Sequence, residues 1–494
     1  MSKHSTTFAG NVLKLTSGSV VAQGIGVLLA PIVARLFAPE AFGVAALFTS
    51  ITSIVGIVAC LRYELSIMLP GSDNEAANLL AVSLLCVVIV ACITALVIVC
   101  FDDVIVGLFN VDKLKQYLWL VPPTVLLAGI SLALNNWNTR TKQFGRLSIT
   151  QVVSASITQV IKVVAGFAGY VSGGVLILAS ILGGLVSTLI LGCQIWKNDN
   201  QLFKSSIRRH KIGYGIKRYR NFSLIDTWGS LLNIISWQLP VLFLSFYFSP
   251  AIVGFYALGS AVVRMPLRII GSAVAQVFYQ KASEEKNRGD VYQITINTYK
   301  RLVALGLFPL LMLCIIGQDL FLVVFGHNWS EAGIYTQILA PWAFFTFASS
   351  PLSTLFLVFE RQHFALLMHS AIFFTRFISL YIGGILGNVY IALGLFSLTG
   401  VLVYGGLAYW NMRLAGISFY TIAAVFLRYF CYFFPAALSL LFMKYYLGIS
   451  SAILLIVSIF MICFYELIVF CRDDYFKGYI NGKKVKHLIY GRAY

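Results

Sequence analysis

The stretch GSAVVRMPLRIIGSAVAQVF, residues 259–278, is apolar and long enough to cross a bilayer, yet it contains two arginines. About 20 residues of helix span the hydrocarbon core. Arg264 and Arg268 are four residues apart, so they share one face of such a helix. Pro266 between them removes a backbone donor and favours a bend. The stretch therefore predicts a bent membrane helix with a cationic face and a hinge at Pro266.

The rest of the chain is also apolar. Of its 494 residues, 59% are hydrophobic and 11% are charged, and the mean hydropathy is +0.86. This composition excludes an ordinary soluble protein and predicts an all-α polytopic membrane protein with about 14 transmembrane helices. The predicted segments are roughly 10–34, 41–62, 77–100, 117–137, 148–170, 174–196, 222–247, 251–280, 292–316, 332–358, 364–384, 388–411, 421–443 and 450–471. The first runs directly into the second, which indicates an uncleaved membrane helix.

The basic residues predict the orientation. An even number of spans places both termini and the even-numbered loops on one side, which holds most of the 36 Lys and Arg residues. Because excess Lys and Arg marks the cytoplasmic face, we expect both termini to be cytoplasmic. The densest basic runs are residues 197–220 and 481–494. They indicate contact with anionic membrane lipids rather than with nucleic acid, since neither contains a nucleic-acid module.

The second half of the chain repeats the first at a nearly constant offset. The matching pairs are PEAFGVAAL (39–47) with PAIVGFYAL (250–258), DVIVGLF (103–109) with DLFLVVF (319–325), LVP (120–122) with LAP (339–341), and KQF (142–144) with RQHF (361–364). A repeat unit of six spans gives both copies the same orientation, which predicts two parallel six-helix bundles with the substrate path between them. The predicted division is a bundle at 1–200, a basic cytoplasmic linker at 201–221, a second bundle at 222–415, two additional helices at 416–471 and a basic cytoplasmic tail at 472–494.

Basic residues within the predicted spans are the candidate binding residues. They are Lys162, Arg264, Arg268, Arg376 and Arg428. A charge at the bilayer centre costs about 2.5–3.5 kcal/mol, so such residues usually face protein or water. Arg428 lies near a span end and is expected to snorkel to the headgroups. The other four predict a cationic cavity for a phosphate or carboxylate, because a guanidinium matches those oxygens in pairs. The alternative is that they pair with acids or snorkel, although few carboxylates lie within the spans.

The sequence contains no pattern that predicts enzymatic chemistry. The nine cysteines lie in or beside apolar segments without a CxxC, and the histidines lack ligand-spaced partners. No phosphate loop or nucleophilic triad is present. We therefore expect no metal, no cofactor and no catalytic residue.

Three segments resemble a known family. They are LRYELSIMLPGSDNEAANLLAVSLL (61–85), SLLNIISWQLPVLFLSFYFSPAIVGFYALGSAVVRMPLRIIGSAVAQVFYQKAS (230–283) and VFGHNWSEAGIYTQILAPW (324–342). They are similar to bacterial oligosaccharide flippases of O-antigen and exopolysaccharide synthesis, within the multidrug/oligosaccharidyl-lipid/polysaccharide exporter superfamily. The resemblance implies a protein of the bacterial inner membrane that moves undecaprenyl-pyrophosphate-linked oligosaccharide repeat units to the periplasmic leaflet by alternating access.

The resemblance also implies roles for residues and partners. Arg62 and Glu64 carry the family's motif at the cytoplasmic end of the second span, where they gate, bind or form a structural ion pair. Glu64 and Asp226 are the carboxylates available for coupling to an ion gradient. The polysaccharide polymerase and the chain-length machinery are partners to expect beside the lipid-linked anionic oligosaccharide.

Two other functions stay open. A drug or cation exporter of the same architecture would require carboxylates in the middle of the membrane, and these are scarce. A membrane glycosyltransferase or polymerase acting on the same lipid would require a sizeable extramembrane loop with catalytic acids, and the predicted outer loops are short. Both are therefore less favoured than the flippase.

Overall fold

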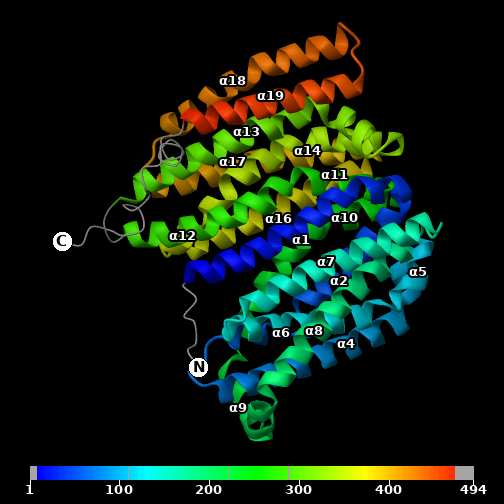
Figure 1. Cartoon of the computed structure of the whole chain (residues 1–494), viewed down its shortest axis with the longest axis vertical. Coiled ribbons are helices and arrows are strands. Elements are labelled where there is room, and N and C mark those ends of the chain that lie inside the picture. Colours follow the sequence, from blue (N-terminus) through cyan, green and yellow to red (C-terminus); the bar gives the residue numbers. More distant parts are fainter. Residues whose placement is uncertain (1–7, 110, 221, 287–289, 473–494) are drawn as a thin grey trace. The chain divides into compact units, whose positions relative to one another are not determined.

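The chain forms helices throughout the part that we describe. The computed structural model describes residues 8–109, 111–220, 222–286 and 290–472, and these ranges contain helices and turns but no strand (Figure 1). This confirms the predicted all-α class. Residues 1–7 and all but the first residue of the predicted tail at 472–494 lie outside the described residues.

Most predicted spans correspond to long apolar helices. Within the described ranges, twelve helical segments are long and apolar enough to cross a membrane. They are α1 (Phe8–Leu36), α2 (Pro39–Ile57), α4 (Asp73–Phe109), α7 (Phe144–Phe167), α8 (Gly173–Ser206), α10 (Thr227–Tyr247), α13 (Val291–Val324), α14 (Ser330–Ser349) with its continuation to Val358, α16 (Gln362–Ile385), α17 (Val389–Leu414), α18 (Phe419–Tyr445) and α19 (Ser451–Arg472). The chain is therefore a multi-pass membrane protein.

A thirteenth segment is bent. Helix α11 (Pro250–Val263) ends just before Pro266, and a π-helix, η2 (Leu267–Gly271), leads into α12 (Ser272–Lys286). The two arms, Pro250–Val263 and Leu267–Lys286, are together long and apolar enough to cross a membrane, and the helix axis bends by 48° between them. A proline cannot donate the helical hydrogen bond to the carbonyl four residues earlier, so the regular α-helix is interrupted at this point.

The count of 14 membrane spans is not confirmed. The remaining predicted segment, 117–137, is largely helix α6 (Val121–Arg140), whose 20 residues would reach about 30 Å. It is not among the helices that are apolar enough to count as spans. Its C-terminal third, NNWNTR, is polar, and Asn138 is fully buried within the protein.

Short helices occupy several segments between the spans. They are α3 (Tyr63–Ser66), α5 (Asp112–Leu118), α9 (Arg209–Arg218) and a π-helix, η1 (Phe222–Asp226). Helix α9 lies within the predicted basic linker and packs on α4, where a Cβ on Gly215 would lie 3.1 Å from the Leu79 side chain. The linker is therefore helical over this part and is held against the first half of the chain.

The chain divides into two compact units. One contains Met1–Leu258 and Ile372–Ala392, and the other contains Gly259–Ala371 and Leu393–Tyr494. In the first unit, α1 packs on α7, α7 on α8, and α4 on α6. In the second, α13 packs on α14, α18 and α19. The predicted domain boundaries at 200, 221, 415 and 471 stay a prediction.

Small residues allow close helix contacts in the first unit. A Cβ on Gly18 of α1 would lie 2.5 Å from the Ser148 Cβ of α7, and one on Gly166 of α7 would lie 2.8 Å from a methyl group of Leu36. Close backbone approach of this kind is how membrane helices gain packing energy without a hydrophobic driving force. At the C-terminal end of α1, Val33 and Phe37, the residue that follows the helix, pack with Leu176 in a buried apolar cluster.

Candidate anion-binding cations and an ion-pair cluster

The four predicted binding cations are divided between the two units. Lys162 of α7 and Arg376 of α16 belong to the first unit, and Arg264 and Arg268 belong to the second. Each pair is therefore described in its own unit. Their shared role in one binding site stays a prediction.

Lys162 has no counter-charge among the residues that the structure describes. Lys162 is partly buried on α7, a helix that packs against both α1 and α8. One turn further along α7, Gly166 contacts α1 through Leu36. Within the described ranges, no hydrogen bond or ion pair engages the Lys162 ammonium group. A cation held in a membrane helix in this way is costly unless an anion or water reaches it.

Arg376 is buried and held against α10. Its residue is 3% exposed. One guanidinium nitrogen donates to the Ser236 backbone carbonyl at 3.0 Å and to the Ser236 hydroxyl at 3.2 Å. The guanidinium carbon lies 4.5 Å from the centroid of the Trp237 ring, within cation–π range. These neutral partners orient the guanidinium and link α16 to α10.

Arg264 folds back on its own helix. Its Nε donates to the Ser260 carbonyl at 3.1 Å, and a terminal guanidinium nitrogen donates to the Ser260 hydroxyl at 3.1 Å. It follows directly after the last residue of α11. The side chain therefore stabilises the end of α11 at the position where Pro266 interrupts the regular helix.

Arg268 lies in the π-helical turn after that break. Its backbone N–H donates to the Arg264 carbonyl at 3.1 Å. Within the described ranges, no hydrogen bond or ion pair engages its guanidinium group. π-Helical turns are uncommon and occur frequently at functional sites. The bend therefore holds a second intramembrane cation whose positive charge no described carboxylate neutralises.

Arg62, Glu64 and Asp226 form a cluster outside the membrane spans. Arg62 Nε lies 2.8 Å from an oxygen of Asp226, and its terminal nitrogen lies 3.4 Å from an oxygen of Glu64. The Glu64 side chain is 0% exposed, whereas that of Asp226 is 47% exposed. The sequence motif therefore joins the turn after α2 to η1 through ion pairs, and its role in gating or coupling stays a prediction.

The backbone at this cluster is unusual. Leu61 has a φ of 46° and Arg62 a φ of 62°, so two consecutive residues with side chains adopt the left-handed conformation. Such residues cost of order 1–3 kcal/mol each and persist where their surroundings fix them. The ion pairs of Arg62 help to hold this backbone conformation, because they anchor its guanidinium to Glu64 of α3 and Asp226 of η1.

Glu64 is the most unusual member of the cluster. Burial raises the pKa of its carboxyl group, and the nearby Arg62 guanidinium only partly opposes this. One of its carboxylate oxygens, Oε2, has no hydrogen-bond partner among the described residues. The group is therefore held where its protonated form is favoured more than that of an exposed glutamate.

Further polar contacts around the cluster were not predicted from the sequence. Arg140 at the end of α6 contacts Asp73 at 3.0 Å and the Ile67 carbonyl at 3.0 Å. Arg218 of α9 contacts Glu75 of α4 at 2.8 Å. The sequence shows charged residues at the ends of apolar segments, but it does not show which of them form ion pairs with one another.

Comparison with known proteins places the chain in a family. A family model described as "Polysaccharide biosynthesis protein" matches residues 32–333. The succinoglycan biosynthesis transport protein ExoT of Rhizobium meliloti (strain 1021) is 25% identical over a 179-residue alignment, and the match covers 32% of this chain. The match covers only 36% of that relative's length.

Solved structures share the fold at low sequence identity. The lipid II flippase MurJ, in an inward closed conformation, is 11% identical, with a TM-score of 0.69 over 92% of this chain and 98% of its own. An inward-facing multidrug resistance MATE family transporter of the MOP superfamily is 14% identical, with a TM-score of 0.63 over 81% of this chain and 95% of its own. Together with the family match over more than half of the sequence, these findings confirm the predicted resemblance, and the chain belongs to the polysaccharide biosynthesis protein family.

Proposed function

We propose that this protein is a flippase for an oligosaccharide linked to undecaprenyl pyrophosphate. It carries the headgroup from the cytoplasmic to the periplasmic leaflet of the bacterial inner membrane, with both termini in the cytoplasm. Membership of a polysaccharide biosynthesis family supports this proposal, as does partial similarity to a succinoglycan transport protein. The fold is one that the lipid II flippase MurJ also has.

The observation that carries the proposal is the pair of cations without described partners. Lys162 and Arg268 lie in apolar membrane helices, where each charge costs about 2.5–3.5 kcal/mol. A pyrophosphate passing these residues supplies the missing opposite charge. The cost is then offset during transport, when the substrate is bound.

The other predicted residues take supporting roles. The guanidinium groups of Arg376 and Arg264 are oriented by Ser236 and Ser260, and each adds positive charge that attracts a passing anion. Pro266 is the hinge that lets the bent helix change shape. Arg62, Glu64 and Asp226 form a gate that opens when the ion pairs exchange, and Glu64 is the carboxylate that couples transport to protons. We expect the polysaccharide polymerase and the chain-length machinery to use the translocated product.

The experiment uses a bacterial strain that lacks its own flippase for the matching glycan. Wild type, K162Q, R268Q and the charge-retaining K162R are expressed, and lipid-linked glycan is measured in each leaflet together with surface polysaccharide. We expect wild type and K162R to restore surface polysaccharide. K162Q and R268Q should leave the intermediate in the cytoplasmic leaflet.

The matched control is R413Q, which removes an exposed cation at the end of α17 whose guanidinium contacts the Tyr409 hydroxyl at 2.7 Å. It should transport as wild type does. Normal transport by inserted, folded K162Q and R268Q would refute the anion path. Drug resistance without glycan movement would instead identify a drug exporter, and lengthened glycan chains in a polymerase-deficient host would identify a polymerase.

A further inference from the structure

The second unit contains a cavity that the predicted binding residues do not use. It has a volume of about 880 Å³ and lies between α13, α18 and α19. These three helices pack on one another, so the cavity walls belong to one packed group. Helices α18 and α19 follow the predicted six-span repeat, and none of the four predicted binding cations lines the cavity.

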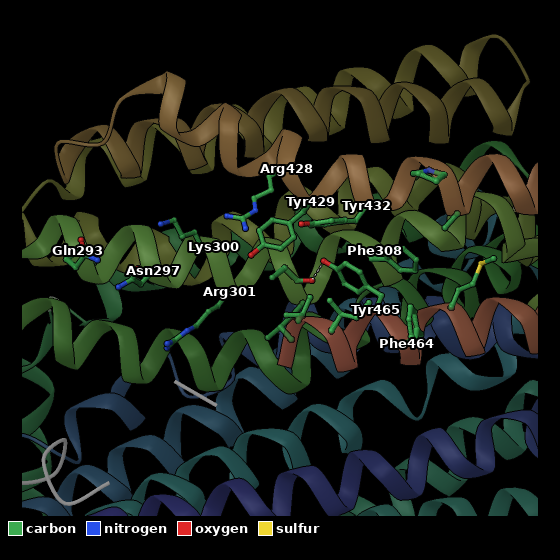
Figure 2. Close-up of a pocket in the computed structure, with 17 residues that line it drawn as sticks. Gln293, Asn297, Lys300, Arg301, Phe308, Arg428, Tyr429, Tyr432, Phe464 and Tyr465 are labelled. Atoms are coloured by element: carbon green, nitrogen blue, oxygen red, sulfur yellow. Dashed lines mark hydrogen bonds between the residues drawn. The ribbon is translucent and has the colours of Figure 1, made fainter. Parts of the chain in front are cut away.

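One end of the cavity is cationic. Lys300 and Arg301 of α13 and Arg428 of α18 line it, together with the amide side chains of Gln293 and Asn297 (Figure 2). Within the described ranges, no hydrogen bond or ion pair engages the Lys300 ammonium or the Arg428 guanidinium. The two groups lie on different helices and face the same cavity. This end therefore offers positive charge and hydrogen-bond donors from two walls.

The other end of the cavity is apolar and aromatic. Phe308 lies eight residues beyond Lys300, which is about 12 Å along α13. Its ring stacks on that of Tyr465, with 4.3 Å between centroids and 11° between planes. The Tyr465 hydroxyl donates to the Ala304 carbonyl at 2.7 Å, which fixes this part of the wall. Polar groups at one end and a fixed aromatic surface at the other match an amphiphile.

The wall of the cavity reaches the surface of the second unit. Phe464, which lines it, is 56% exposed. Other large apolar side chains of α18 and α19, which do not line the cavity, are exposed as well. They are Leu427, Phe434, Leu438, Leu441 and Phe442 on α18, and Ile456, Phe460 and Leu467 on α19. Exposed apolar side chains of membrane helices contact acyl chains, so an acyl chain of a bilayer lipid can reach the cavity at Phe464.

From these observations we infer that the cavity is a binding site for an anionic phospholipid of the surrounding bilayer. Its phosphate contacts Lys300, Arg301 and Arg428, its headgroup accepts and donates hydrogen bonds at the amides, and an acyl chain lies along Phe308 and Phe464. The cationic end lies on the predicted cytoplasmic side, where basic clusters meet anionic headgroups. Arg428, which the sequence predicts to snorkel to any headgroup, is thereby part of a specific site.

The test compares lipid retention by matched variants. Wild type, K300Q/R428Q and K281Q/R413Q are placed in nanodiscs of phosphatidylcholine with phosphatidylglycerol, extracted with detergent, and examined by native mass spectrometry for retained lipid. Lys281 of α12 and Arg413 of α17 are exposed cations that do not line the cavity, so the control loses the same charge elsewhere in the second unit. We expect wild type and control to retain phosphatidylglycerol preferentially. K300Q/R428Q should bind it about tenfold or more weakly, since each Lys or Arg near a membrane contributes about 1 kcal/mol.

A second variant tests the apolar end. A436W places a large side chain in the cavity without changing charge, because Ala436 lines it on α18. Loss of retained phosphatidylglycerol is expected here too, together with loss of the rise in melting temperature that this lipid gives to wild type. Circular dichroism and gel filtration show whether A436W has folded. If it has not, K300Q/R428Q provides the decisive comparison, because both of its substitutions are at exposed positions.

Several outcomes would overturn the assignment. Equal retention by wild type and K300Q/R428Q would mean that the cations do not bind the lipid. Equal loss in both double variants would reveal a general effect of surface charge, and equal retention of phosphatidylcholine would show a site without charge preference. Displacement by excess inorganic phosphate, or selectively by undecaprenyl phosphate, would identify a different ligand. Because the readout is lipid binding, it is independent of the proposed transport function.

Discussion

Gly43 of α2 lies against the first turn of α11, and Gly254 of α11 lies against the first turn of α2. A Cβ on Gly43 would collide with the backbone carbonyl of Pro250, and a Cβ on Gly254 would collide with that of Pro39. These four residues are the proline and the glycine of the two PxxxG motifs that the internal repeat predicts. The equivalent segments of the two repeats therefore pack on each other through backbone atoms.

This contact predicts a strong effect of a single methyl group. G43A or G254A should lower the free energy of unfolding by about 1–3 kcal/mol, because backbone atoms cannot move aside as a flexible side chain can. Thermal unfolding of the purified protein in detergent measures this. The control is G24A in α1, where a Cβ meets nothing within 4 Å. A melting temperature of G43A equal to that of G24A would contradict the packing.

The Arg62 cluster predicts unequal costs for its ion pairs. R62Q leaves the fully buried Glu64 without its cation, so it should destabilise by about 3 kcal/mol at neutral pH. D226N removes a half-exposed partner and should cost only about 0.2–1 kcal/mol. The double variant R62Q/E64Q should recover much of the R62Q loss. If D226N proves as damaging as R62Q, burial of Glu64 is not the dominant factor.

Glu64 predicts a dependence of stability on pH. Burial raises the pKa of its carboxyl above the ordinary 4.5. Between pH 4.5 and the raised pKa, the folded protein binds more protons at this carboxyl than the unfolded chain does. The contribution of Glu64 to stability is therefore fully present below pH 4.5 and is lost as the pH rises through the raised pKa. E64Q should flatten this decline in melting temperature. E284Q, at an exposed position of α12, should leave the wild-type slope unchanged.

The two repeats predict a contrast between a buried and an exposed ion pair. Asp319 of α13, with a 7% exposed side chain, accepts from Lys444 at 2.6 Å and from the Ser451 hydroxyl at 2.7 Å. Its repeat counterpart Asp103 contacts Lys115 at 2.5 Å, and both side chains are at least half exposed. We therefore expect K444M to destabilise by about 3–5 kcal/mol and K115M by about 1 kcal/mol or less.

The D319N/K444M double variant checks the reason for this contrast. It removes the charge that K444M leaves behind, so thermal unfolding should show a partial recovery of stability. If K444M and K115M shift the melting temperature equally, the burial of Asp319 is not what makes the pair matter.

Sequence patterns located the helices well, because a membrane span is specified by a local property. About 20 apolar residues suffice for the signal, and Pro266 marks the interruption of α11 by its missing donor. Helix length was harder to predict. Helix α8 continues to Ser206 and α13 to Val324, whereas the hydropathy signal ends near 196 and 316.

Contacts between distant residues could not be predicted, since they depend on packing. The sequence marks Arg376 as an intramembrane cation but gives no reason to expect Ser236 or the Trp237 ring beside it. The cavity lined by Arg428 joins segments from α13, α18 and α19, which are far apart in the chain. Helix α9 was not predicted, because most of its residues are charged or glycine. Its short apolar side, which packs on α4, gives too weak a hydropathy signal.

The contact of Asp319 with Lys444 has a consequence for biosynthesis. The two residues are 125 positions apart, and ribosomes deliver a chain from its N-terminus. When α13 enters the membrane, its carboxylate therefore precedes its counter-ion by four long helices. Until α18 arrives, the nascent chain holds an uncompensated acid, and a product shortened before α18 would keep it permanently. The last helices thus complete the insertion of a segment made much earlier.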